Sequence, residues 1–180
     1  MTIRYALLGF LSWRPFSGYD LKKMIAHSSA FYWSGNNNQI YRTLIQLHQE
    51  GLVSQEIQLQ DSLPAKKLYS ITDAGQEALH AWALATPELP EQHNSFLVQL
   101  AWAAALDDAE LDGLLERYAG ELQARLLMLQ EGARRQAPGP RRSRRETFLW
   151  DAIERNVAAV YTHELEWVQG LRQALRQGEY

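Results

Sequence analysis

Residues 33 to 52 have the pattern of a short amphipathic helix. Apolar side chains recur at i, i+4 and i+7 within this segment, at Ile40, Leu44 and Leu47. This spacing predicts a helix that buries one stripe. Gly51 stands where a C-terminal helix glycine is expected, so we predict that the helix ends there.

The other side of this predicted helix is polar, with Asn37, Asn38, Gln39 and Arg42. Asn36, followed three residues later by Gln39, resembles a capping box and predicts that the helix begins with this polar face. Amides bind adenine bidentately and guanidinium groups bind guanine, and recognition helices present their N-terminal residues to base edges. The pattern indicates a base-reading helix; the alternative is the solvated face of an ordinary small helix.

Two further helices are predicted upstream. Residues 3–11 form a nearly continuous apolar run, long enough for a buried helix, and Pro15 prevents its continuation. Ser17 is a suitable N-cap for a second helix that extends from Gly18 to about residue 27. This second helix would cross the DNA backbone in a helix-turn-helix.

A hairpin is predicted downstream. Residues 52–59 and 67–71 have strand-like composition, and a turn signal at residues 61–64 separates them. Thr72 is then the predicted N-cap of a further helix. The elements together predict a winged helix-turn-helix with a two-stranded wing. The side chains that we expect to hold phosphates around its base-reading helix are Tyr19, Lys22, Lys23, Tyr41, Lys66 and Lys67.

The ordered motifs of about the first 80 residues resemble one known family. They include Ser17-Gly18-Tyr19-Asp20-Leu21-Lys22-Lys23, Glu50-Gly51-Leu52-Val53, Lys67-Leu68-Tyr69 and Thr72-Asp73-Ala74-Gly75. In this order and spacing they resemble the PadR family of bacterial transcriptional regulators. The resemblance implies a DNA-binding homodimer, commonly a repressor, that is released by a small molecule or by a change in its C-terminal half. The chain departs from the family pattern before the helix tyrosine, where three asparagines replace the usual proline, serine and glycine.

Composition is ordinary for a folded soluble protein. The 180 residues are 46% hydrophobic and 22% charged, and they include no cysteine, which excludes disulfides, thiol redox sensing and thiolate metal sites. The apolar opening is too short to span a membrane and lacks a cleavage-like site, so we expect a cytoplasmic protein without membrane contact.

Net charge gives only a modest basic footprint. Residues 1–85 contain seven Lys and Arg against six Asp and Glu, a balance of +1, and the whole chain carries −3. Five of the seven basic residues lie in the segments expected to face DNA. We therefore expect weak non-specific binding with a shallow salt dependence.

The second half has only helical signals. After a proline-bounded connector at residues 86–90, we predict helices at about 95–105, 107–134 and 145–177. A helix of about 30 residues is about 45 Å long, too long to bury its apolar stripe on the winged domain alone. We therefore expect a mainly α protein with a DNA-binding domain at 1–86 and a helical dimerisation domain at 87–180. The predicted dimer interface comprises Leu111, Leu115, Tyr118, Leu122, Val157, Val160, Val168 and Leu171.

Two features have open interpretations. Aromatic side chains can form the walls of a site for a flat ligand, although aromatic residues at helical spacing more often belong to the core. The candidates for binding an aromatic effector, such as a phenolic acid, are Trp33, Trp82, Trp102, Trp150, Tyr161 and Trp167. The basic run between Arg134 and Arg145 is either a solvated loop or an auxiliary phosphate contact.

Catalysis is not expected. The chain has no glycine-rich phosphate loop, no His-Glu-x-x-His, no Gly-x-Ser-x-Gly and no histidines at metal-ligand spacing, so we predict neither a cofactor nor a metal. The alternative to DNA binding is a winged module that docks other proteins. Its surface would be more apolar than the polar face described above.

Overall fold

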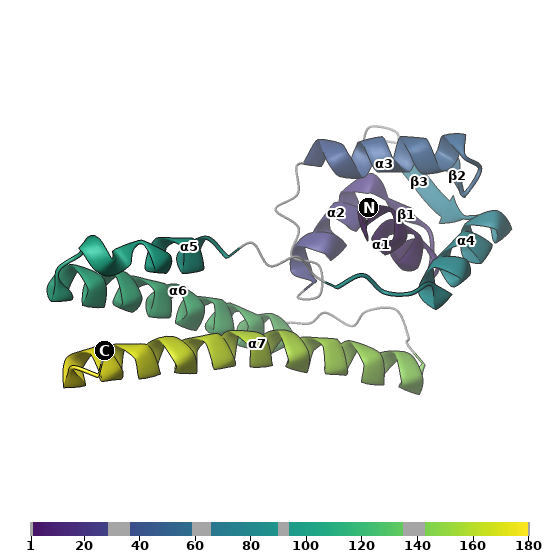
Figure 1. The fold of residues 1–180 in the computed structure, drawn as a ribbon. Coiled ribbons are helices and arrows are strands. Elements are labelled where there is room, and N and C mark those ends of the chain that lie inside the picture. Colours follow the sequence, from purple (N-terminus) through teal and green to yellow (C-terminus); the bar gives the residue numbers. More distant parts are fainter. Residues whose placement is uncertain (1, 29–36, 59–65, 90–93, 135–142, 180) are drawn as a thin grey trace. The chain divides into compact units, whose positions relative to one another are not determined.

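The computed structural model of this chain describes residues 2–28, 37–58, 66–89, 94–134 and 143–179 (Figure 1). The chain divides into two compact units, Met1–Glu88 and Leu89–Tyr180, and each has its own apolar core. From the sequence we predicted the boundary between the two domains after residue 86, whereas the first unit of the structure ends at Glu88. No helix within the described ranges is long and apolar enough to cross a membrane.

The N-terminal unit is a winged helix-turn-helix. Its elements are α1 (Thr2–Leu11), β1 (Phe16–Ser17), α2 (Gly18–His27), α3 (Asn37–Gln49), β2 (Val53–Gln58), β3 (Lys66–Ile71) and α4 (Asp73–Leu84). The antiparallel sheet has three strands in the order β1-β3-β2. The sheet therefore has one strand more than the predicted two-stranded wing. This strand is β1, in which Phe16 pairs with Tyr69 and Ser17 with Leu68.

Three local signals, at Ser17, Gly51 and Thr72, have the effects at helix ends that were predicted from the sequence. The Ser17 hydroxyl accepts a hydrogen bond from the Asp20 amide at 3.1 Å, and the Thr72 hydroxyl accepts one from the Gly75 amide at 3.1 Å. Gly51, with φ of 73°, has the left-handed conformation that glycine adopts most readily. The amides that follow α3 bond back to its last turn, so this helix ends in a Schellman motif.

The core of this unit holds α3 in place. Leu44 and Leu47 have no exposed surface and Ile40 has little, as their spacing predicted. They pack with apolar residues of α1, α2 and the sheet, including Leu7, Leu8, Leu11, Leu21 and Val53. The buried stripe therefore turns the opposite side of α3 to the surface.

The secondary structure described for the C-terminal unit is all helical, with α5 (Ser95–Ala101), a short 3-10 helix (Ala103–Ala105), α6 (Asp108–Arg134) and α7 (Arg144–Gln177). The antiparallel helices α6 and α7 pack along each other (Figure 1). Phe96 of α5 completes their core. The predicted helix at 95–105 is thus broken after Ala101, where the chain tightens into the 3-10 turn.

The structure places most of the predicted dimer-interface residues in or against the core of their own chain. Leu115, Leu122 and Val168 are buried in the core of their own chain, and Leu111, Tyr118 and Leu171 pack against that core. The packing of α5, α6 and α7 within one chain therefore accounts for their periodicity. The remaining two predicted residues, Val157 and Val160, are respectively half-buried and 59% exposed.

A polar cluster explains why a carboxylate interrupts the apolar stripe of α7. The Tyr118 hydroxyl donates to Glu164 Oε1 at 2.9 Å, and the Asn94 amide donates to the same oxygen at 3.3 Å. Burial, together with this carboxylate, raises the pKa of Tyr118. Because Asn94 also caps α5 through the Phe96 amide, the cluster joins the start of α5 to both long helices.

A second polar contact joins α6 to the end of α7. The Arg172 guanidinium binds the Asp112 carboxylate with donor–acceptor distances of 2.8 and 2.9 Å, and Arg176 reaches the same carboxylate at 3.1 Å. These guanidinium groups hold the pKa of Asp112 well below its usual range.

Candidate nucleic-acid interface

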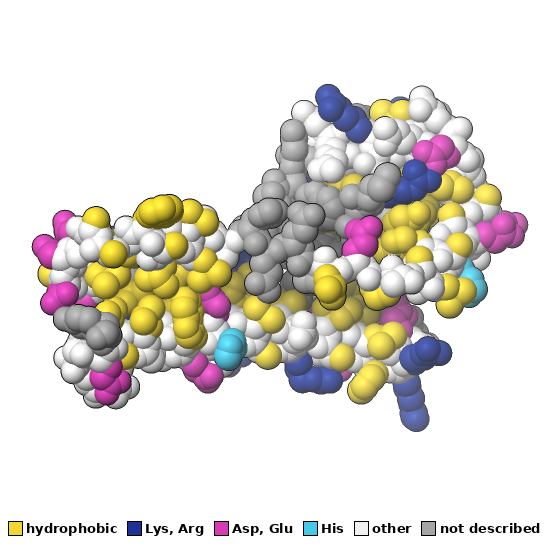
Figure 2. Space-filling model, viewed as in Figure 1, with side chains coloured by type: hydrophobic (Ala, Val, Ile, Leu, Met, Phe, Trp, Pro, Cys, Tyr) yellow, Lys and Arg dark blue, Asp and Glu magenta, His cyan; other side chains and the backbone are white. Residues whose placement is uncertain are grey.

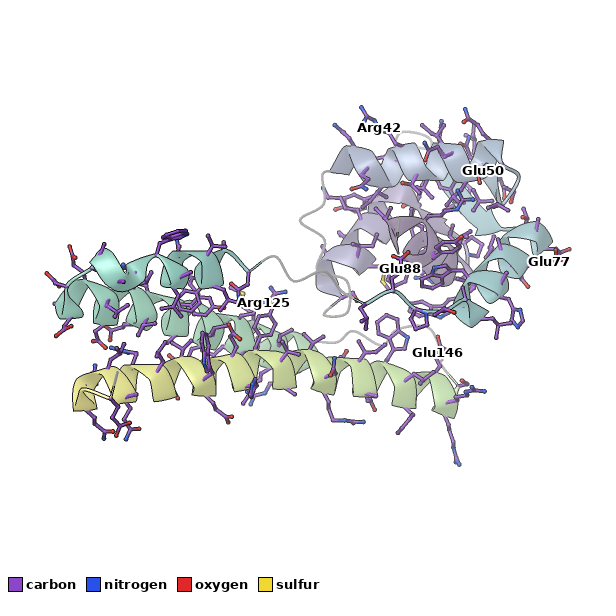
Figure 3. The ribbon with its side chains drawn as sticks, viewed as in Figure 1. Arg42, Glu50, Glu77, Glu88, Arg125 and Glu146 are labelled. Atoms are coloured by element: carbon purple, nitrogen blue, oxygen red, sulfur yellow. The ribbon has the colours of Figure 1, made fainter. Side chains whose placement is uncertain are left out.

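The exposed side of α3 carries three of the side chains that were predicted to read bases. Asn38, Gln39 and Arg42 are exposed, and Arg42 projects outward from the helix (Figure 3). Asn37 is the first residue of α3, although its side chain is not described, and Asn36 lies outside the described residues. The first half of α3 therefore presents amides and a guanidinium to solvent.

Tyr41 has a structural role that the sequence analysis missed. A Cβ atom at Gly18 would lie only 2.5 Å from Cε1 of Tyr41, so the tyrosine ring packs against the first residue of α2. Tyr41 is nevertheless 43% exposed. The close approach of α2 and α3 explains why glycine precedes Tyr19 in the motif, and only the pairing of the two helices in space reveals it.

The helix α2 contributes three of the predicted phosphate contacts. Tyr19 is 56% exposed, and the Lys23 ammonium lies 4.5 Å from the centroid of the Tyr19 ring, within cation–π range. Lys22 is half-buried on the same helix. The structure thus brings these side chains together on α2.

The two wing lysines differ in their surroundings. Lys67 is exposed and pairs across the sheet with Ile57. Lys66 is half-exposed, and its ammonium lies 3.0 Å from Oδ2 of Asp20 on α2. From the sequence alone these two lysines are equivalent, and Asp20 has no predicted role. The serine-to-aspartate spacing of a capping box was the one signal that marked Asp20.

Two ion pairs neutralise part of the basic charge of the N-terminal unit. Arg4 of α1 binds Glu50 at the end of α3, and Lys66 binds Asp20. The Arg4 guanidinium lowers the pKa of Glu50. Outside these two ion pairs, the lysines and arginines on α2, α3 and β3 are Lys22, Lys23, Arg42 and Lys67.

The candidate aromatic residues for an effector fall into separate places. Trp82 stacks on Tyr5 with ring centroids 4.6 Å apart, and Trp33 lies outside the described residues. In the C-terminal unit Trp167 meets Phe96 edge to face, and Trp102 is 80% exposed. The other two candidates are half-buried on α7, at Trp150 and Tyr161.

The basic run is described only at its edges. Arg134 ends α6, and Arg144 and Arg145 begin α7, all three with exposed side chains. Arg135, Arg141 and Arg142 lie outside the described residues, as does the turn predicted at residues 61–64.

Two family models match this chain. Residues 7–81 match the transcriptional regulator PadR-like family, and residues 93–176 match the C-terminal region of virulence activator alpha. The two matches fall within the N-terminal and C-terminal units respectively.

Solved structures share this fold. Bacillus subtilis PadR in complex with operator DNA matches with a TM-score of 0.83 at 24% identity, covering 97% of this chain and 99% of that chain. The same protein in complex with p-coumaric acid matches with a TM-score of 0.79 at 23% identity, covering 98% and 99%. The Vibrio cholerae virulence activator AphA matches with a TM-score of 0.70 at 24% identity, covering 97% and 98%.

A curated relative connects the fold to a family. The negative transcriptional regulator PadR of Bacillus subtilis is 30% identical over 130 residues, which are 72% of this chain and 71% of that protein. A probable transcriptional regulator of Mycobacterium tuberculosis is 34% identical over 90 residues, 50% of this chain and 47% of that protein. The matched relatives are regulators of transcription and not enzymes. This chain therefore belongs to the PadR-like family of transcriptional regulators.

Proposed function

We propose that this chain binds an inverted-repeat operator as a homodimer and represses transcription by occupying a promoter. The observation that carries the proposal is the exposed polar side of α3, whose opposite stripe is fully buried. A helix held in this way can enter a major groove with its N-terminal residues at base edges. The structure of Bacillus subtilis PadR with operator DNA supports the same use of the fold here.

Arg42 is proposed to read a base, with Asn37, Asn38 and Gln39 beside it. The exposed phenol of Tyr19, the ammonium groups of α2 and that of Lys67 on the wing then hold phosphates on either side. Because phosphate contacts carry no sequence information, specificity comes from the first half of α3.

Replacing Arg42 by alanine is expected to cost about 1 to 3 kcal/mol of binding to the cognate operator. Binding to a scrambled duplex should change much less, because a lost base contact matters only on the right sequence. Titrations of both duplexes at one salt concentration measure the difference. Arg155→Ala, which removes the same charge from an exposed position on α7, is the control. An equal loss on both duplexes would make Arg42 a phosphate contact.

Homodimerisation is proposed to use apolar side chains that the C-terminal unit leaves exposed (Figure 2). On α7 the exposed fraction is 63% for Phe148, 50% for Leu149, 41% for Ile153 and 59% for Val160. Leu149, Ile153 and Val160 follow a 4-7 spacing along one side of the helix. Exposed apolar groups at helical spacing are typical of a surface that a partner covers.

Replacing both Leu149 and Ile153 by glutamate is expected to convert the dimer to a monomer, because two charges would be buried at the interface. The helical content should stay unchanged, since both side chains are exposed in the single chain. Sedimentation analysis measures the oligomeric state. Gln169→Glu with Gln173→Glu adds the same charge at exposed positions off this stripe and should leave the dimer intact. A charged double variant that still dimerises would contradict the proposed interface.

A small aromatic acid is proposed as the effector that releases the protein from DNA. The support is the complex of Bacillus subtilis PadR with p-coumaric acid, together with the 80% exposure of Trp102 in this chain. An effector lowers DNA affinity only as far as it binds the two forms of the protein differently.

Adding p-coumaric acid is expected to weaken operator binding and to change tryptophan fluorescence over the same concentration range. Hexanoate, which has the same charge without the ring, should do neither. Operator binding that is unaffected by saturating p-coumaric acid would exclude this compound as the effector.

A further inference from the structure

One carboxylate of the N-terminal unit joins three elements. Oδ2 of Asp20, in the first turn of α2, accepts a hydrogen bond from the Ser17 hydroxyl at 2.7 Å and lies 3.0 Å from the Lys66 ammonium. Ser17 belongs to β1 and is 5% exposed, and Lys66 begins β3. The start of the returning wing strand is therefore attached to the helix that precedes the base-reading helix.

The charge state of Asp20 fits this attachment. Burial disfavours the charged carboxylate, but hydrogen bonds from Ser17 and Lys66 outweigh it and lower the pKa of Asp20. The carboxylate is therefore ionised at neutral pH and attracts the ammonium. Its position in the first turn of α2 favours the same charge through the helix dipole.

The neighbouring lysine is in a different situation. Successive residues of a strand point to opposite faces, so Lys66 and Lys67 leave β3 on different sides. Lys67 is exposed at a position opposite Ile57. To reach a phosphate Lys66 has to give up the carboxylate, whereas no ion pair of this kind is described for Lys67.

We propose that Lys66 is a positioning residue, which holds the wing against α2 through Asp20 when the protein is on DNA, and that Lys67 is the wing lysine that neutralises a phosphate. This assignment rests on the DNA-binding function proposed above. Side chains at both ends of the pair are more than a third exposed, so the pair contributes little to the stability of the fold. Its effect is on the angle of the wing relative to α2.

The assignment predicts different salt dependences for the two lysines. Each phosphate neutralised by a protein cation contributes about 0.9 to the slope of log affinity against log salt. Lys67→Met is therefore expected to reduce the slope by about 0.9 per protomer. Lys66→Met should leave the slope unchanged and lower the affinity by about two- to fivefold at every salt concentration, in line with the loss of a partly exposed ion pair.

A double-mutant cycle tests the link to Asp20. The proteins are the full-length wild type, Asp20→Asn, Lys66→Met and the double variant, and the probes are the duplex enriched by selection from random sequences and a mixed-sequence duplex of equal length. Lys66→Met should cost nothing further once Asp20 is asparagine, and Lys66→Arg, which can keep the ion pair, should bind like the wild type. Asp73→Asn removes the same charge from the first turn of α4 and is the control for net charge.

Two results would overturn the assignment. One is that Lys66→Met reduces the salt slope as much as Lys67→Met does. The other is that Lys66→Met lowers the DNA affinity of the Asp20→Asn protein as much as it lowers that of the wild type. Chemical unfolding of the same proteins without DNA shows that each variant is folded and measures the coupling of the pair independently. A folded wild type that bound neither duplex would instead refute the DNA-binding function itself.

Discussion

Replacing Gly75 by alanine is expected to destabilise the N-terminal unit by about 3 kcal/mol, the upper part of the usual range for overpacking. A Cβ atom at this position would overlap the carbonyl oxygen of Leu52 and lie 2.8 Å from Cγ1 of Ile71. The carbonyl cannot easily move, because it accepts a hydrogen bond from the Thr72 amide at 3.1 Å. The start of α4 would therefore have to leave the sheet.

Chemical unfolding measures this loss, and Gly9→Ala is the matched control. Gly9 lies inside α1, and a Cβ atom there would meet nothing within 4 Å. Its replacement should stabilise the unit by about 0.5 to 1 kcal/mol, because alanine loses less backbone entropy than glycine in a helix. Equal effects of the two substitutions would refute the close approach of α4 to Leu52.

Replacing Leu44 by alanine is expected to cost about 2 to 5 kcal/mol of stability. Leu44 has no exposed surface and lies at the centre of the stripe that holds α3 on the core. The cavity left behind would loosen the one helix that presents Asn38, Gln39 and Arg42. DNA affinity should therefore fall more than the fraction of unfolded protein explains.

The neighbouring Ile45 is 52% exposed, and Ile45→Ala is the control for this change. It should cost well under 1 kcal/mol, since little apolar surface is lost from the core. Chemical unfolding and operator titration of both variants provide the comparison. A Leu44→Ala protein that kept wild-type stability would show that α3 is not held by this stripe.

The helix boundaries could be predicted because their signals are local. Ser17 and Thr72 bind amides within their own first turns, and Gly51 adopts the left-handed conformation that ends α3. The stripe of Ile40, Leu44 and Leu47 was predictable for the same reason, since helical geometry alone places these side chains together.

Contacts between distant segments were less predictable. The strand β1 consists of Phe16 and Ser17 alone, too short for any alternation to mark it, and it exists because β3 lies beside it. The periodicity of α6 and α7 identified their apolar stripes correctly. It could not show whether these stripes pack within one chain or against a second copy. Leu115, Leu122 and Val168 pack within their own chain, because α5, α6 and α7 form a core that a single long helix does not reveal.

The exposed face of α3 and the wing illustrate the same limit. The exposure of Arg42 followed from the helix period, whereas the separation of Lys66 from Lys67 depended on Asp20, which is far away in the sequence but 3.0 Å from Lys66 in space. Adjacent residues of the same type can thus differ in role when only one of them has a charged partner.

We propose that this chain recognises a DNA sequence through α3 as a dimer. Selection of random duplexes on the purified protein, followed by titration of the enriched sequence against a scrambled one at fixed salt, tests it most directly. We expect an inverted repeat with half-sites about ten base pairs apart and a preference of about a thousandfold or more over the scrambled duplex. A folded dimer that enriched no sequence, with or without p-coumaric acid, would contradict it.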